Sequence, residues 1–215
     1  MWNPKSLNLN ATRLVASAVG VLAGVLGVEH GLFEMLQGNV AAGGLMVDAI
    51  GPGSAFQGSE PALTLIPNFF ATGVLAVSVS LVVVLWAALF LERKNGGLIL
   101  IILSIVQILV GGGFAPISLG VIAGIVANWI NRPLTWWQVH LPLNARKILS
   151  KLFPCFLVSF LLLSLFDLEI AVSGNNMELS GTVTSLMFGF LFLSIIAGFA
   201  RDISENRIIS PIKDP

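Results

Sequence analysis

The chain has 215 residues, of which 56% are hydrophobic and only 10% are charged, and its mean hydropathy is +0.93. A soluble domain carries about 25% charged residues, so this composition excludes an ordinary soluble domain and predicts an integral membrane protein. The 11 basic and 11 acidic residues balance, which leaves no basic tail for nucleic acid, and the single cysteine, Cys155, excludes an intrachain disulfide.

Apolar segments follow one another along the chain, and we predict one all-α domain over residues 1–215, a polytopic transmembrane helix bundle of about six spans. The long apolar stretch 97–131 contains GGGFAP at 111–116, and three glycines and a proline favour a tight reversal over one continuous helix. We therefore divide it into two short spans that form a hairpin; a re-entrant pair that does not cross the bilayer is the alternative. The predicted spans are 14–36, 67–91, 97–112, 116–131, 152–172 and 182–200.

The distribution of charge predicts the orientation of these spans. With both termini in the cytoplasm, all 11 Lys and Arg residues fall on the cytoplasmic side, in agreement with the positive-inside rule. We therefore predict an N-in, C-in protein of the cell membrane. The opposite side holds acidic residues and no basic ones: Asp48, Glu60, Asp167, Glu169 and Glu178.

Three segments outside the spans have distinct compositions. Residues 39–66 form the longest outer loop, either a plain surface connection or a lid or short interfacial helix over the outer end. Residues 132–147 carry Trp136 and Trp137 among basic residues, which predicts an interfacial segment on the cytoplasmic face, where a solvated His140 needs no further role. Residues 201–215 are polar and predict a frayed tail.

The first span contains polar residues that a lipid-facing helix does not need. Counted from Arg13 at the inner boundary, Glu29 lies roughly 24 Å along the helix, so Glu29, His30 and Glu34 fall in its outer third. At about 100° per residue, Glu34 lies on a stripe of small residues with His30 beside it, whereas Glu29 points roughly the other way. His30 and Glu34 are i, i+4 neighbours, so their side chains can meet.

The small-residue stripe predicts that the first span lies in the middle of the bundle. Gly20, Gly24, Gly27 and Gly31 share one face of the helix and include a GxxxG motif at 20–24, which lets another helix approach closely. The same face is a candidate contact for a homo-oligomer.

Candidate partners for the polar cluster lie on neighbouring segments. Gln37 flanks the stripe, Asn68 opens the second span, and Gln107 lies in the body of the third. Each of the last two also has a structural explanation, since Asn68 is a good helix N-cap and Gln107 can bond a neighbouring helix. The candidate ligand-binding residues, which together would form a polar pocket under the 39–66 loop, are Glu29, His30, Glu34, Gln37, Asn68 and Gln107.

Three interpretations of this cluster stay open. The first is the binding or transport of a small solute or ion, because carboxylates inside a membrane often mark such paths. The second is a structural or assembly subunit in which the polar residues only fix helix packing. The third is a metal-dependent enzyme, because HxxxE places His30 and Glu34 on one helix face.

The third interpretation is the least supported. The chain offers no second intramembrane histidine and no cysteine cluster to complete a metal site. It also has no serine triad, no phosphate-binding Gly-Lys motif and no aspartate pair inside the bilayer. We therefore expect no cofactor; the expected partners are the lipid bilayer and a small solute or ion.

Part of the sequence resembles a family of small multi-pass membrane proteins from bacterial and archaeal genomes. The resemblance covers roughly residues 15–137 and rests on four motifs in this order: EHGLFEMLQGN, EPALTLIPNFFATG, ERKNGGLILIILS and GGGFAPISLGVIAGI. It implies a prokaryotic inner-membrane setting and no particular activity.

Overall fold

A computed structural model of the protein describes residues 10–51, 59–173 and 177–209. Four helices in these ranges are long and apolar enough to cross a membrane: α1 (Ala11–Leu36), α2 (Phe69–Leu89), α6 (Leu143–Ser173) and α7 (Met177–Ile209). Two shorter apolar helices, α3 (Gly96–Leu109) and α4 (Phe114–Ala127), and the short α5 (Thr135–His140) lie between them. The all-α class is confirmed, and the apolar helices indicate a membrane-embedded protein.

Each predicted span overlaps one helix, with boundaries that differ by up to five residues at most ends and by nine residues at two ends. α6 begins at Leu143, inside the predicted interfacial segment, and α7 continues to Ile209, so residues 201–209 are helical and not frayed. The extension of α7 beyond the predicted span has a physical reason at Asp202. The Asp202 carboxylate accepts hydrogen bonds from the N–H groups of Ala11 (2.7 Å) and Thr12 (3.0 Å). This contact docks the end of α7 on the start of α1. Residues 210–215 lie outside the described ranges.

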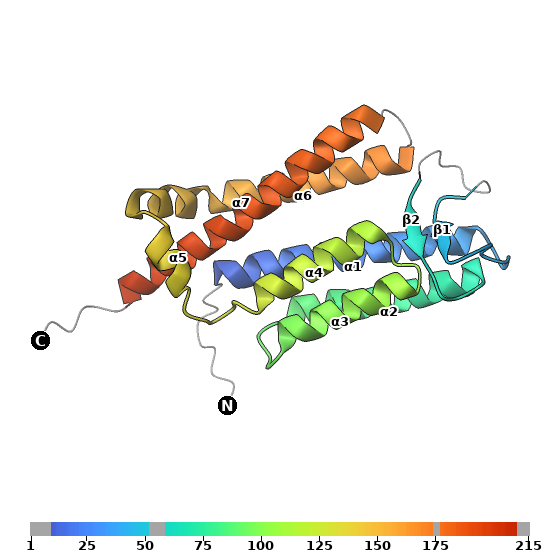
Figure 1. Ribbon diagram of the computed structural model, residues 1–215, viewed down its shortest axis with the longest axis horizontal. Coiled ribbons are helices and arrows are strands. Elements are labelled where there is room, and N and C mark those ends of the chain that lie inside the picture. The colour runs from blue at the N-terminus through green and yellow to red at the C-terminus, as the bar shows by residue number, and fades with distance from the viewer. Residues whose placement is uncertain (1–9, 52–58, 174–176, 210–215) are drawn as a thin grey trace, which may run out of the picture.

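α1 runs through the middle of the bundle, as its small-residue stripe predicts (Figure 1). It packs against α2, α4 and α7, while α3 packs against α2 and α4. The backbones of α1 and α2 touch at Gly31 and Gly73, because a Cβ atom on Gly31 would lie 2.7 Å from the Gly73 carbonyl oxygen. The rest of the stripe likewise faces atoms of α2, α3 and α4. The glycine face that the sequence suggests as a homo-oligomer contact therefore packs against other helices of the same chain.

The α3–α4 hairpin reverses at residues 111–113, as predicted. Gly111 and Gly113 have φ angles of +96° and +80°, a backbone region that only glycine adopts readily. Each of the two helices has 14 residues and is therefore about 21 Å long, shorter than the roughly 30 Å of a hydrocarbon core. Where helices this short place a turn inside the hydrocarbon core, protein and not lipid has to satisfy its backbone groups.

Residues of the 39–66 loop form hydrogen bonds with the backbone at this turn. Strands β1 (Met46–Asp48) and β2 (Pro61–Leu63) form an antiparallel pair. The N–H of Gly111 donates to the carbonyl of Leu63 (3.0 Å), and the N–H of Leu65 donates to the carbonyl of Leu109 (2.9 Å). The described part of the loop therefore folds back over the end of the bundle that holds the α3–α4 turn, as an antiparallel strand pair, and it contains no interfacial helix.

Basic residues gather at the opposite end of the bundle. Arg13 at the start of α1 forms an ion pair with Glu92 in the α2–α3 turn (3.2 Å). Arg201 near the end of α7 lies over the Phe153 ring of α6 (5.6 Å to the ring centre). Figure 1 shows α5, the start of α1 and the end of α7 at one end, with β1 and β2 at the other. The bundle thus has one basic end and one end covered by the loop.

Candidate functional site

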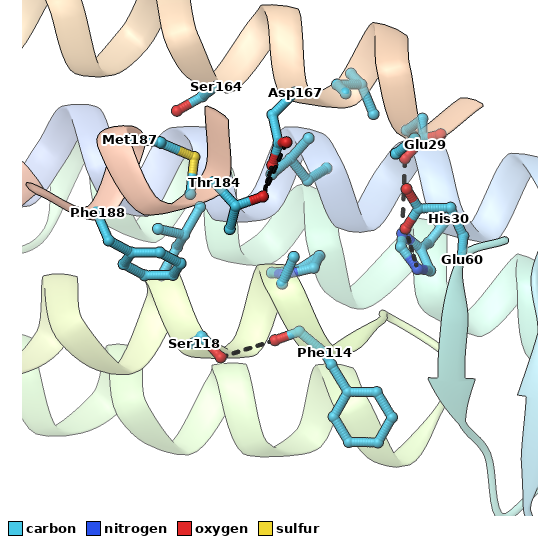
Figure 2. A pocket seen from close by; sticks show the side chains of 16 residues that line it. Glu29, His30, Glu60, Phe114, Ser118, Ser164, Asp167, Thr184, Met187 and Phe188 are labelled. Atoms are coloured by element: carbon cyan, nitrogen blue, oxygen red, sulfur yellow. Dashed lines mark hydrogen bonds and ion pairs between the residues drawn. The ribbon is translucent and has the colours of Figure 1, made fainter. Parts of the chain in front are cut away.

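A pocket of about 260 Å³ lies between α1, α4, α6 and α7, beside the loop residue Glu60 (Figure 2). At about 30 Å³ for one liquid water, its volume suits a small organic molecule or a cluster of waters. Most of the wall is apolar, formed by Leu26, Phe114, Leu119, Leu168, Met187 and Phe188. The titratable residues that line it are Glu29, His30, Glu60 and Asp167.

The polar lining falls into two groups along the pocket. Figure 2 shows Glu29, His30 and Glu60 grouped beside the strands, at the loop-covered end. Met187 and Phe188 lie at the far end, deeper in the bundle. Ser164, Asp167 and Thr184 form the second polar group, nearer to Met187, so the pocket carries its densest charge at the loop-covered end and a smaller polar group deeper in the bundle.

His30 is the centre of the polar end. Its side chain is 2% exposed, and Nε2 lies 3.2 Å from a carboxylate oxygen of Glu60, while Nδ1 lies 3.6 Å from one of Glu29. Neither contact has the geometry of a hydrogen bond, and both ring nitrogens lack a hydrogen-bond partner among the described residues. The α3–α4 turn passes close to the ring, because a Cβ on Gly113 would collide with it. The imidazole therefore lies between two carboxylates at ion-pair distance, without a hydrogen bond to either.

Glu60 comes from the loop and reaches over the pocket. Its position is fixed by Asp48, whose carboxylate accepts a hydrogen bond from the Glu60 N–H (2.7 Å). Burial raises the pKa of Glu60 to about 7; nearby His30 opposes the rise, whereas Glu29, Asp48 and Asp167 add to it. Glu60 therefore gains and loses its proton near neutral pH.

Asp167 of α6 faces the pocket from the opposite wall. The hydroxyl of Thr184 on α7 lies 2.9 and 3.0 Å from its two carboxylate oxygens, and the Ser180 hydroxyl lies 3.5 Å away. These contacts hold the α6 carboxylate in place. Neither Glu60 nor Asp167 is among the predicted site residues, although an aspartate inside an apolar span was a signal that could have identified the second.

Glu34 lies apart from this pocket. Its side chain is completely buried, its carboxylate lies against Gly111, and it has no hydrogen-bond partner among the described residues. The predicted contact between His30 and Glu34 is not formed, because the His30 ring is directed at Glu29 and Glu60 instead.

The three predicted amide residues hold the fold together, and they do not line the pocket. Gln37 donates to the carbonyls of Asp48 (2.8 Å) and Ala49 (2.7 Å) and so anchors the outer loop. Asn68 caps α2, where its side-chain oxygen accepts from a backbone N–H (3.0 Å). Gln107 donates to Ser80 on α2 (2.9 Å) and to a backbone carbonyl of α1 (3.2 Å).

Neither a metal-binding cluster among the described residues nor a related protein indicates what the pocket binds. Across residues 10–51, 59–173 and 177–209, no three His, Cys, Asp or Glu side chains are grouped so that they could hold a metal ion. Comparisons with protein families, curated proteins and solved structures find no match for the chain. The fold and the site define an α-helical bundle with membrane-spanning character and an acidic, largely apolar pocket.

Proposed function

We propose that this protein binds a small solute or ion at an outward-facing membrane site, as a binding component or as a transporter. The observation that carries the proposal is the pocket, in which one imidazole and three carboxylates converge between largely apolar walls. Small-molecule sites are typically concave and mostly apolar, with a few placed polar groups. Ionisable residues within membrane helices typically line solute or proton pathways.

The proposal includes a topology of six spans with both termini in the cytoplasm of a prokaryotic cell. The gathering of Arg13, Arg146 and Arg201 at the end opposite the loop supports it. A cysteine-labelling experiment in a Cys155→Ser background tests it. A membrane-impermeant maleimide should label Ser59→Cys on intact cells and Lys147→Cys only after permeabilisation. Labelling of Lys147→Cys on intact cells would refute the orientation.

Ligand binding is tested with the purified protein in a neutral detergent. The melting temperature is followed by tryptophan fluorescence in the presence of sodium, potassium, ammonium, alkylammonium, acetate, sugars and amino acids. We expect at least one class to raise the melting temperature, as a ligand that binds only the folded state must. Ala171→Phe, which fills the pocket from α6, should abolish that rise. If no solute stabilises the wild-type protein, the proposal fails.

A structural or assembly subunit is the second candidate, and the use of Gln37, Asn68 and Gln107 in packing favours it. The variant Asp167→Asn, which keeps an acceptor for Thr184, separates the two. A binding role predicts a nearly normal melting temperature without solute and a lost response to solute. A packing role predicts a lower melting temperature that no solute restores.

A further inference from the structure

We infer that the pocket selects a small amphiphilic cation, an amine with an alkyl or aryl body whose ammonium group lies among Glu29, Glu60 and Asp167. The inference rests on the proposed function and specifies its substrate class. It is carried by the charge of the lining, by the apolar side chains that form most of the remaining wall, and by the polar atoms of the site that lack a hydrogen-bond partner among the described residues.

The charge of the lining excludes an anionic ligand. Among the residues that the structure describes, three carboxylates and one imidazole line the pocket, and no Lys or Arg does so. The N-terminus of α4 at Phe114 adds about half a positive charge. Even with His30 protonated and the carboxylates ionised, the local charge is roughly −1.5. Protonation of Glu60 reduces this value and does not reverse its sign.

The unsatisfied atoms indicate where the ammonium group binds. Both carboxylate oxygens of Glu29 are buried and lack a hydrogen-bond partner among the described residues, as do both nitrogens of His30. An ammonium group has three N–H donors and no acceptor, and carboxylates are the acceptors with which it forms its strongest hydrogen bonds. Glu29 and Glu60, on either side of His30, offer such acceptors.

The remainder of the pocket suits an apolar body. The remaining lining is mostly apolar and includes Leu119, Leu168 and Phe114. Met187 and Phe188 lie on the side of the pocket away from Glu29 and Glu60 (Figure 2). A hydrated inorganic cation would gain nothing from this surface, whereas an alkyl or aryl chain gains roughly 0.8 kcal/mol per buried CH₂. Aromatic faces also attract a nearby cation. The density of charge at the loop-covered end places the charged head there and the apolar tail toward Met187 and Phe188.

A matched ligand series tests the inference in the purified, full-length protein. Binding of n-butylammonium, n-butanol and butyrate is measured by titration of the melting temperature in neutral detergent. We expect n-butylammonium to bind at least about tenfold more tightly than n-butanol, and butyrate to produce no shift. Ammonium chloride, which lacks the apolar body, should bind more weakly than n-butylammonium.

Variants that each remove one carboxylate charge identify the group that binds the ammonium group of the ligand. Glu29→Gln removes a carboxylate that makes no hydrogen bond within the described residues, and Asp167→Asn keeps an acceptor for Thr184. Each should weaken n-butylammonium by about tenfold to a hundredfold, as expected for the loss of one charged hydrogen bond, and should leave n-butanol unchanged. Glu205→Gln, an exposed residue at the far end paired with Arg201, is the matched control.

The outcomes separate the substrate class from the proposed function. Equal affinity for n-butylammonium and n-butanol, or a preference for butyrate, overturns the cationic class while the pocket keeps its binding role. Equal affinity for ammonium and n-butylammonium overturns the amphiphilic class. The absence of stabilisation by every solute overturns both. If one variant does not fold, the other gives the same test, since each removes a single carboxylate of the lining.

Discussion

Replacing Glu60 by glutamine tests whether the loop carboxyl is buried beside His30. The pKa of Glu60 rises from 4.5 to about 7 because burial disfavours the ionised form. At about 1.4 kcal/mol per pKa unit, this difference corresponds to about 3 kcal/mol. The folded state binds the proton more tightly than the unfolded state does. The resulting stabilisation is therefore fully present below pH 4.5 and is lost as the pH rises through about 7.

The assay is unfolding in mixed micelles of sodium dodecyl sulfate and a neutral detergent, followed by tryptophan fluorescence between pH 5 and 8. The free energy of unfolding of the wild-type protein, measured relative to Glu60→Gln, should fall by about 3 kcal/mol across this range. Comparison with the variant cancels the titration of groups far from Glu60, and the remaining difference belongs to Glu60 together with His30, whose ring lies 3.2 Å away. Glu205→Gln, a surface carboxylate in an i, i+4 ion pair, should show no such pH-dependent difference. A constant difference between the wild type and Glu60→Gln would show that the carboxyl is not buried at His30.

Two further predictions concern the fold around the site. Gly111→Ala and Gly38→Ala both place alanine at a positive φ of similar size, but only a Cβ at Gly111 meets the Glu34 carboxylate. Gly111→Ala should therefore lose about 1–3 kcal/mol more in the same unfolding assay, and equal losses would contradict the contact. Asp202→Ala removes three hydrogen bonds at the start of α1 and should lower the free energy of unfolding by about 3 kcal/mol. An unchanged free energy of unfolding would mean that α7 does not dock on α1 through Ala11 and Thr12.

The helices could be predicted from the sequence because their determinants are local. Apolar runs of sufficient length produce α1, α2, α6 and α7. The glycines at 111–113 reverse the chain because two of them adopt positive φ angles. The glycine stripe places α1 centrally, since a backbone without side chains can be contacted closely by neighbouring helices. Each of these signals acts within one segment and needs no knowledge of distant partners.

The candidate pocket could be predicted only in part, because its other half comes from distant segments. Counting the helical rise from Arg13 groups Glu29 and His30 at one level of α1, and both line the pocket, although periodicity directs Glu29 away from Glu34. The i, i+4 rule states which side chains can meet, but not which partner a side chain takes. His30 is directed at Glu60, a loop residue that only the β1–β2 pairing brings over α1. Asp167 joins the same pocket through α6, which periodicity within α1 cannot reveal.

The three-glycine turn links the fold to the pocket. Gly111 lies against Glu34, Gly112 against Gln107 and Gly113 against His30, each so closely that a Cβ would collide. The turn thus contacts three polar residues that the sequence analysis groups together, although only His30 lines the pocket. Because glycine has no side chain, the chain can pass close to these buried polar groups. Glu34, Gln107 and His30 therefore share a contact with the turn, whereas the carboxylates of Glu29 and Glu60 line the pocket with His30.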